Sequence, residues 1–281
     1  GRTLITSDGT TILGADDKAG IAEILTMIER IQTENRPHGT ICVAFTPDEE
    51  IGMGAEHFNL DQFGAEYAYT LDGDSEGEIQ YENFNACKAE FEIRGFNVHP
   101  GEGKDTMINA SLVAIEINNC LPSMETPRGT EDYEGFYHLI SMQGEVGEAK
   151  LNYIVRDHDK NGFEERKKTL RLIEKNLNAK WGEGTVTLKI TDQYLNMKEI
   201  VEEHMHLIDH AKKACEAAGV APLILPIRGG TDGCQLSFKG LPCPNLGTGG
   251  HAFHGPYEHI SVEGMEKSVE LLLALIQEYT K

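Results

Sequence analysis

Short apolar runs alternate with helical patterns at both ends of this 281-residue chain. Residues 10–32 predict a strand, a tight turn and an amphipathic helix, because apolar residues recur there at helical spacing. These apolar residues are Ile21, Ile24, Leu25, Ile28 and Ile31. The runs at 39–46 and 66–73 predict further strands, and the pattern returns after 196. Such alternation is typical of an α/β fold with a mostly parallel sheet covered by helices.

The pattern changes near Asn83, where polar and apolar residues begin to alternate as in a half-exposed strand. A helix is predicted at 109–121, two antiparallel strands within 135–157, a charged helix at 162–180 and a last strand at 184–194. This order is β-α-β-β-α-β. We therefore predict an α+β domain at 85–195, inserted between two segments of the α/β domain, 1–84 and 196–281.

The composition excludes several kinds of partner. The net charge is −21, and no cluster of Lys and Arg is present, so neither nucleic acid nor an anionic membrane surface is an expected partner. The longest apolar run, 271–276, is too short to cross a bilayer. Six scattered cysteines without a C-x-x-C pair favour a reducing, cytoplasmic setting.

Polar residues follow the predicted strands at four places. These are Asp16-Asp17, Glu49-Glu50, Asp72 and the histidines of "GGHAFHGPYEH". Ligands of open α/β sheets gather outside the carboxyl ends of the strands. Carboxylates and a histidine that meet there could bind a divalent metal, and a nearby carboxylate that is not a ligand could act as a general base.

Each place also has an ordinary structural interpretation. Asp16 precedes a helix and could cap it. Glu49 and Glu50 could lie in a solvated loop, and Asp72 belongs to a "DGD" stretch typical of turns. The metal hypothesis rests on the shared position of these residues at strand ends.

Several motifs together resemble a known family. "GADDKAG", "TPDEEIG", "LDG", "RGGTDG" and "HGPYEH" occur in this order around the inserted domain. They resemble the dinuclear zinc peptidase family that includes aminoacylase and carboxypeptidase G-type enzymes. "ENFNA", "NVHPG", "YEGFYH" and "LSFKGLPCPNL" extend the resemblance along the chain and are similar to its aminotripeptidase branch.

The resemblance implies a role for each residue at the strand ends. Asp16 corresponds to the carboxylate that bridges two zinc ions and precedes a cis peptide bond. Asp72 corresponds to a ligand of the first metal, and Glu50 and His254 to ligands of the second. Glu49 corresponds to the general base that takes a proton from a metal-bound water. The expected reaction releases the N-terminal residue of a tripeptide.

The inserted domain corresponds to the family's lid. His99 matches the residue that stabilises the developing oxyanion, which requires a preorganised donor. Asn109, Arg156 and Arg228 match positions that hold the backbone and the C-terminal carboxylate of a small peptide substrate. A guanidinium suits a carboxylate because it can donate two parallel hydrogen bonds. Without the resemblance, His99, Asn109 and Arg156 would be interpreted as structural residues.

One motif of the family, an H-x-D on an earlier strand, has no counterpart before Asp16. In the family its histidine is a ligand of the first metal. The N-terminal part of the catalytic domain is therefore expected to be missing, which would leave apolar sheet surface uncovered. A complete site would hold two zinc ions, and this chain alone is expected to hold one and to be weakly active or inactive.

Three other functions compete with a tripeptidase. The first is deacylation of N-acyl amino acids, which would use the same metals. The second is a dinucleotide-binding oxidoreductase, since 247–252 formally fits G-x-G-x-x-A, although Pro256 follows where a helix should open. The third is a non-catalytic binding module that kept the fold. The sequence does not decide the oligomeric state.

Overall fold

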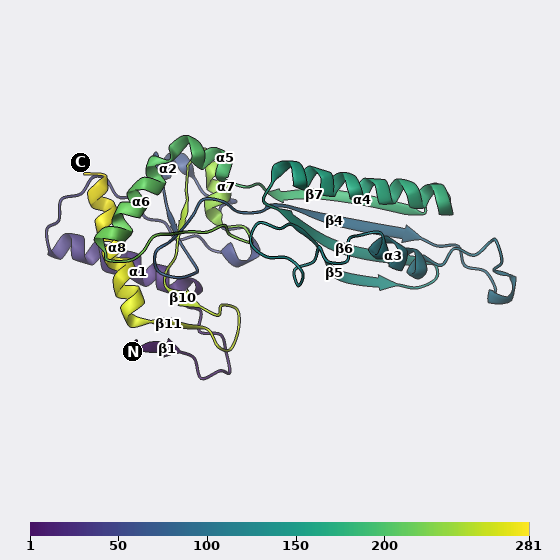
Figure 1. Ribbon diagram of the computed structural model, residues 1–281, viewed down its shortest axis with the longest axis horizontal. Helices are drawn as coiled ribbons and strands as arrows, with labels where there is room; N and C mark the ends of the chain where they lie inside the picture. The colour runs from purple at the N-terminus through teal and green to yellow at the C-terminus, as the bar shows by residue number, and fades with distance from the viewer. Residues whose placement is uncertain (281) are drawn as a thin grey trace. The chain divides into compact units, whose positions relative to one another are not determined.

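The structure is a computed structural model that describes residues 1–280 and divides into two compact units. The discontinuous unit combines Gly1–Asn83 with the chain from Met197 onwards, and the inserted unit is Phe84–Asn196. The α/β class with an inserted α+β part is confirmed (Figure 1). No helix among residues 1–280 is long and apolar enough to span a membrane.

The discontinuous unit contains two small sheets and several helices. The antiparallel sheet has the order β1-β11-β10 and the mixed sheet the order β2-β9-β3-β8. In the mixed sheet β2 pairs with β9 and β3 with β8 in parallel, whereas β3 and β9 are antiparallel, so two of its three pairings are parallel, as predicted. The elements are β1 (Leu4–Thr6), α1 (Ala15–Thr33), α2 (Leu60–Phe63), β2 (Thr70–Leu71), β3 (Glu78–Gln80), α5 (Lys198–Val201), α6 (His206–Ala217), β8 (Leu223–Ile224), α7 (Asp232–Phe238), β9 (Asn245–Leu246), β10 (Gly250–His251), β11 (His259–Ser261) and α8 (Val262–Glu278), with 3₁₀ turns η1 (Glu49–Ile51) and η3 (Glu202–His204).

The inserted unit is a four-stranded antiparallel sheet with two helices packed on it. The strand order is β5-β6-β4-β7, and the chain order is β-α-β-β-α-β. Along β4, Phe91 and Ile93 are buried against the helices while Glu92 and Arg94 are exposed, as the alternating sequence predicts. The elements are β4 (Asn85–Arg94), α3 (Ala110–Asn119), β5 (Phe136–Gly144), β6 (Glu148–Asp157), α4 (Lys160–Trp181) and β7 (Val186–Tyr194), with a 3₁₀ turn η2 (Pro100–Glu102).

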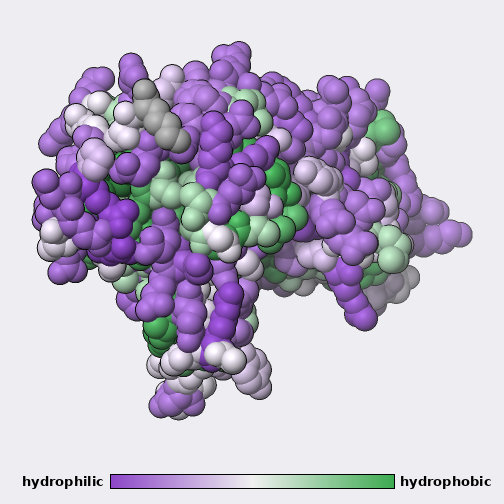
Figure 2. Space-filling view, turned by 60° about the vertical axis from the view of Figure 1, so that its left-hand side comes forward, coloured by the Kyte–Doolittle hydropathy of each residue, from purple (hydrophilic) through white to green (hydrophobic). Residues whose placement is uncertain are grey.

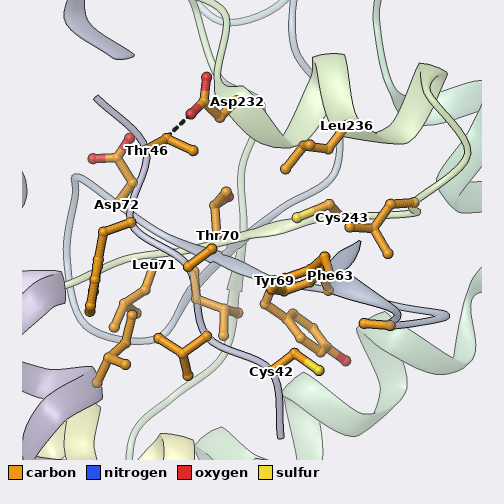
Figure 3. A pocket seen from close by; sticks show the side chains of 18 of the residues that line it. Cys42, Thr46, Phe63, Tyr69, Thr70, Leu71, Asp72, Asp232, Leu236 and Cys243 are labelled. Atoms are coloured by element: carbon orange, nitrogen blue, oxygen red, sulfur yellow. Dashed lines mark hydrogen bonds between the residues drawn. The ribbon is translucent and has the colours of Figure 1, made fainter. Parts of the chain in front are cut away.

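The predicted strand at 39–46 is not formed. The segment pairs with no other strand, and Ile41, Val43 and Phe45 are exposed. It lies along a pocket of about 800 Å³ whose wall also includes Phe63 and Leu236 (Figure 3). A strand needs a hydrogen-bonded neighbour, and this apolar run has none among residues 1–280. Its apolar side chains are exposed, and Figure 2 shows hydrophobic residues exposed among hydrophilic ones.

Helix α1 buries only part of the predicted apolar face, with Ile31 buried and Ile24 and Ile28 half-buried. Ile21 and Leu25 are exposed, whereas Ala19, Glu23 and Met27 are buried. Both carboxyl oxygens of Glu23 lack a hydrogen-bond partner among the described residues. Burial, with the nearby charge of Asp17 as a second cause, raises the pKa of Glu23 to about 9. Glu23 is therefore protonated in the folded protein at neutral pH.

Because Glu23 is protonated in the folded protein, we predict that it lowers the free energy of unfolding as the pH rises. The folded protein binds a proton that the unfolded chain releases near the ordinary glutamate pKa, so the free energy of unfolding should fall between about pH 5 and pH 9. The slope from this one group is at most about 1.4 kcal/mol per pH unit. Glu23→Gln keeps the shape without the ionisation. Urea unfolding of both proteins should show a difference in stability that grows with pH, and a constant difference would contradict the prediction.

Candidate metal centre

Asp16 lies where the chain enters α1 and is held there by a buried glutamate. Its φ and ψ are −85° and 102°, outside the helical range, and the Asp16–Asp17 peptide bond is cis, as the resemblance implies. The backbone N–H groups of Gly14 and Asp16 donate to the Glu258 carboxylate at 2.7 and 3.1 Å. Although burial favours the neutral acid, these donors hold the pKa of Glu258 below its ordinary value.

Glu49 and Glu50 form a tight turn after the unpaired segment. The turn η1 is flanked by Asp48 and Gly52, both with left-handed backbone angles, φ 64° and 73°. Adjacent residues of a strand point to opposite faces, whereas this turn frees both carboxylates from that alternation. Glu49 is half-buried and Glu50 is exposed.

Glu50, Asp16 and His254 come together from three distant parts of the chain. His254 Nε2 lies 3.1 Å from Asp16 Oδ2 and 3.1 Å from Glu50 Oε2. His254 also has a left-handed backbone, φ 59°, in the loop between β10 and β11. One imidazole and two carboxylates within 4.8 Å of one another form a set that could hold a metal ion.

A second set consists of carboxylates alone. Asp72, which follows β2, approaches Asp16 and Asp17, and one oxygen of each lies within 4.8 Å of the others. Burial, followed by the charge of Asp17, raises the pKa of Asp72 to about 9. Burial likewise raises the pKa of Asp17 to about 8, despite a hydrogen bond from the Gly20 N–H.

Glu49 stands beside these two sets as a carboxyl group outside both of them. Burial, then the charges of Asp232 and Glu50, raises its pKa to about 7. A carboxyl with such a pKa can accept and return a proton near neutral pH.

The donors in this region suit a divalent metal. Several carboxyl groups share a small space in which their mutual repulsion and burial oppose ionisation. A cation would reverse that balance, because an opposite charge favours the ionised form. The set of Asp16, Glu50 and His254 offers the imidazole and carboxylate ligands that zinc takes, whereas the set of Asp16, Asp17 and Asp72 offers oxygen only.

The remaining sequence-predicted residues have local partners of their own. His99 is exposed, and its Nδ1 accepts from the Gly101 N–H at 3.2 Å. Asn109 caps α3 by accepting from the Leu112 N–H, and Arg156 donates to Gln193 at 3.2 Å and stacks on Tyr194. Arg228 is half-buried in the loop between β8 and α7.

The sequence predicts no role for three residues near the centre, Asp17, Asp232 and Glu258. Asp17 stands out in the sequence only as the neighbour of Asp16. Asp232 and Glu258 are buried carboxylates that lie within the motifs "RGGTDG" and "HGPYEH". The only available signal was their place in those motifs, since their partners are more than 180 residues away in the chain.

The glycine-rich stretch at 247–252 does not support dinucleotide binding. Gly250 and His251 form β10, and the chain then continues through a loop to β11. A dinucleotide fingerprint needs a helix that opens directly after the glycines. The oxidoreductase alternative therefore fails.

Comparison with known proteins identifies the family. Residues 11–278 match the model of peptidase family M20/M25/M40. The chain is 55% identical over 280 residues to "Peptidase T" of Halothermothrix orenii, a match that covers 99% of this chain and 69% of that protein.

Solved structures agree with this match. The crystal structure of aminopeptidase PepT from Bacillus cereus is similar with a TM-score of 0.86 and 28% identity, covering 99% of this chain and 74% of that one. Bacillus subtilis YXEP, described as a dinuclear metal binding peptidase from the M20 family, shares the fold with a TM-score of 0.70 and 16% identity, covering 93% and 71%. The chain belongs to peptidase family M20/M25/M40.

Proposed function

We propose that the chain is a zinc-dependent aminotripeptidase that releases the N-terminal residue of tripeptides. The observation that carries the proposal is the meeting of Asp16, Glu50 and His254, with the Glu49 carboxyl on the residue before Glu50. The relatives named Peptidase T and aminopeptidase PepT support this choice over deacylation of N-acyl amino acids. The enzyme is a metallopeptidase, and its substrates are small peptides.

The chemistry divides between the metal and the protein. A bound zinc would polarise the peptide carbonyl and make water more acidic. Glu49 takes a proton from the attacking water as the new C–O bond forms, and it returns a proton to the amine as the C–N bond breaks. Its pKa of about 7 suits both transfers.

His99 is assigned to the developing oxyanion. Because its Nδ1 accepts the Gly101 N–H, the neutral ring carries its proton on Nε2 and can donate from that atom. Asn109, Arg156 and Arg228 are assigned to the substrate backbone and its C-terminal carboxylate. The guanidinium groups suit the carboxylate because they can donate in pairs.

Helix α7 holds the loop that carries Glu49 and Glu50. Thr46 Oγ1 donates to Asp232 Oδ2 at 2.6 Å (Figure 3), and Gln235 Nε2 donates to the Gly52 carbonyl at 3.0 Å. Lys239 Nζ donates to the carbonyls of Ala55 and Glu56. These bonds fasten both ends of the loop, so we assign α7 the role of positioning the general base.

We further propose one zinc per chain, bound by Asp16, Glu50 and His254. The set around Asp72 contains no histidine among the described residues, and oxygen-only sites suit harder cations. The six cysteines are all free, which supports the proposal of a reducing, cytoplasmic setting.

The first prediction concerns metal content. Native mass spectrometry of the 281-residue chain after zinc loading should find one zinc ion, because only one set among residues 1–280 combines imidazole and carboxylate donors. His254→Ala should lose this ion, and His138→Ala, a change of an exposed histidine in the inserted unit, should keep it. Two zinc ions, or none, in the unaltered chain would contradict the assignment.

The second prediction concerns the base. Concentrated, zinc-loaded protein should release leucine slowly from Leu-Gly-Gly and should not release it from N-acetyl-leucine. Glu49→Gln should lower the rate by about 100-fold or more, because the variant lacks the general base. The zinc content should stay unchanged, because Glu49 is not assigned as a zinc ligand. Glu56→Gln, an exposed change in the same loop, is the control. Equal turnover by the Glu49 variant would refute the role, and turnover of N-acetyl-leucine alone would favour the deacylase.

The third prediction concerns the support from α7. Gln235→Ala combined with Lys239→Met removes the hydrogen bonds to the loop carbonyls. Hydrogen exchange at 46–56 should become faster and zinc affinity should fall about tenfold, while the fold is kept. Lys175→Met, on an exposed face of α4, should change neither quantity. If the loop exchanges at the original rate in the double variant, α7 does not position it.

A further inference from the structure

The side chain of Arg156 lies on the face of the inserted sheet that is opposite the two helices. Its neighbours along β6, Val155 and Asp157, are buried, and Val155 belongs to the core beneath the helices. Adjacent residues of a strand point to opposite faces, so Arg156 points away from that core. In this sheet β4 lies between β6 and β7 (Figure 1). A residue of β7 can therefore contact Arg156 only across β4.

Such a contact across β4 is made by Tyr194. Arg156 and Tyr194 are opposite the same residue of β4, the small Ala86. Two strand spacings place their backbones about 10 Å apart. The guanidinium spans this distance, since its central carbon lies 5.2 Å from the centre of the Tyr194 ring. The result is a cation–π contact, which a side chain larger than alanine at position 86 would obstruct.

A bulge in β7 brings a second residue to the same guanidinium. The pairing of β7 with β4 shifts between Ala86 and Cys87, so Gln193 has no partner on β4. An extra residue of this kind interrupts the alternation of side chains and can redirect one of them. Gln193 Oε1 accepts a hydrogen bond from Arg156 Nη1 at 3.2 Å. Two adjacent residues, Gln193 and Tyr194, therefore contact one side chain, which a regular strand would not allow.

These contacts leave one edge of the guanidinium available to a ligand. Arg156 Nη1 donates to Gln193 and to the Val155 carbonyl, whereas Nε and Nη2 have no hydrogen-bond partner among residues 1–280. No Asp or Glu of the described chain forms an ion pair with this arginine, although the net charge of the protein is −21. The N–H groups of Nε and Nη2 are parallel and match the two oxygens of a carboxylate. The open edge therefore suits an anionic ligand.

We propose that Gln193 and Tyr194 are positioning residues that hold Arg156 ready for the C-terminal carboxylate of a tripeptide. This inference rests on the proposed function, which assigns Arg156 to that carboxylate. An arginine side chain loses much rotamer freedom when it becomes fixed. Because Gln193 and Tyr194 fix it during folding, less freedom remains to be lost when the carboxylate binds, and the peptide binds more tightly.

The test compares Leu-Gly-Gly with its C-terminal amide, which lacks the carboxylate. Isothermal titration of the zinc-loaded Glu49→Gln chain, in which turnover is suppressed, should show Leu-Gly-Gly bound about tenfold more tightly than the amide. Gln193→Ala combined with Tyr194→Leu should reduce this ratio to about one. Tyr194→Phe, which keeps the ring, and Thr191→Ala, an exposed change on the same strand, should preserve it. A preserved ratio in the Gln193/Tyr194 variant would overturn the proposal.

Arg156→Ala separates a failure of this inference from a failure of the proposed function. If this variant still prefers Leu-Gly-Gly tenfold over the amide, Arg156 does not bind the carboxylate, and both the assignment and the inference are wrong. If Arg156→Ala loses the preference while the Gln193/Tyr194 variant keeps it, only the positioning role is refuted.

A relaxation measurement by nuclear magnetic resonance covers the case in which the double variant fails to fold. In the unaltered chain without peptide, the Nε–H group of Arg156 should be rigid, because Gln193 and Tyr194 hold the guanidinium. The Nε–H group of Arg171, an exposed arginine of α4, should be mobile. An order parameter below about 0.6 for Arg156, in the range of flexible groups, would contradict the positioning role.

Discussion

The crowding of half-buried carboxyl groups, which burial and mutual repulsion keep from ionising, is the constraint on which the candidate metal centre depends. Asp17, Asp72 and Glu49 all have raised pKa values, chiefly through burial and further through the charges of neighbouring acidic side chains. A chain that only needed to fold would not gather them, because each ionised group there costs stability. The arrangement becomes favourable once a cation is present, since its charge stabilises every carboxylate around it. The site therefore links the stability of this region to its metal.

These carboxyl groups are held together by contacts of the neighbouring main chain and not by contacts of the carboxyl groups themselves. Glu258 binds the backbone before and at Asp16, α7 binds both ends of the loop around Glu49, and Asp72 follows directly from β2. In each case the main chain is fixed and the carboxyl is left available. Because these backbone groups form hydrogen bonds to other parts of the protein, the main chain stays in place while the carboxyl groups face one another.

The sequence pattern predicts the elements better than their partners. The alternation along β4 fixes which side faces the core, since each side chain of a strand has one of two faces. The run at 39–46 has the composition of a strand but lacks a neighbour, and α1 exposes Ile21 while burying Glu23. Strand pairing and side-chain burial depend on which segment of the folded chain packs against an element. The local spacing of apolar residues contains no information about that segment.

The candidate site shows the same limit at the level of single residues. Asp16, Glu50 and His254 could be proposed because carboxylates and histidine after strands suggest a metal, and the structure brings them within 4.8 Å. Asp232 and Glu258 act through hydrogen bonds to residues more than 180 positions away, so neither spacing nor composition could reveal them. Both nevertheless fall inside family motifs. A family motif can therefore contain a residue whose role is a long-range hydrogen bond. The sequence does not show that bond, and the folded structure does.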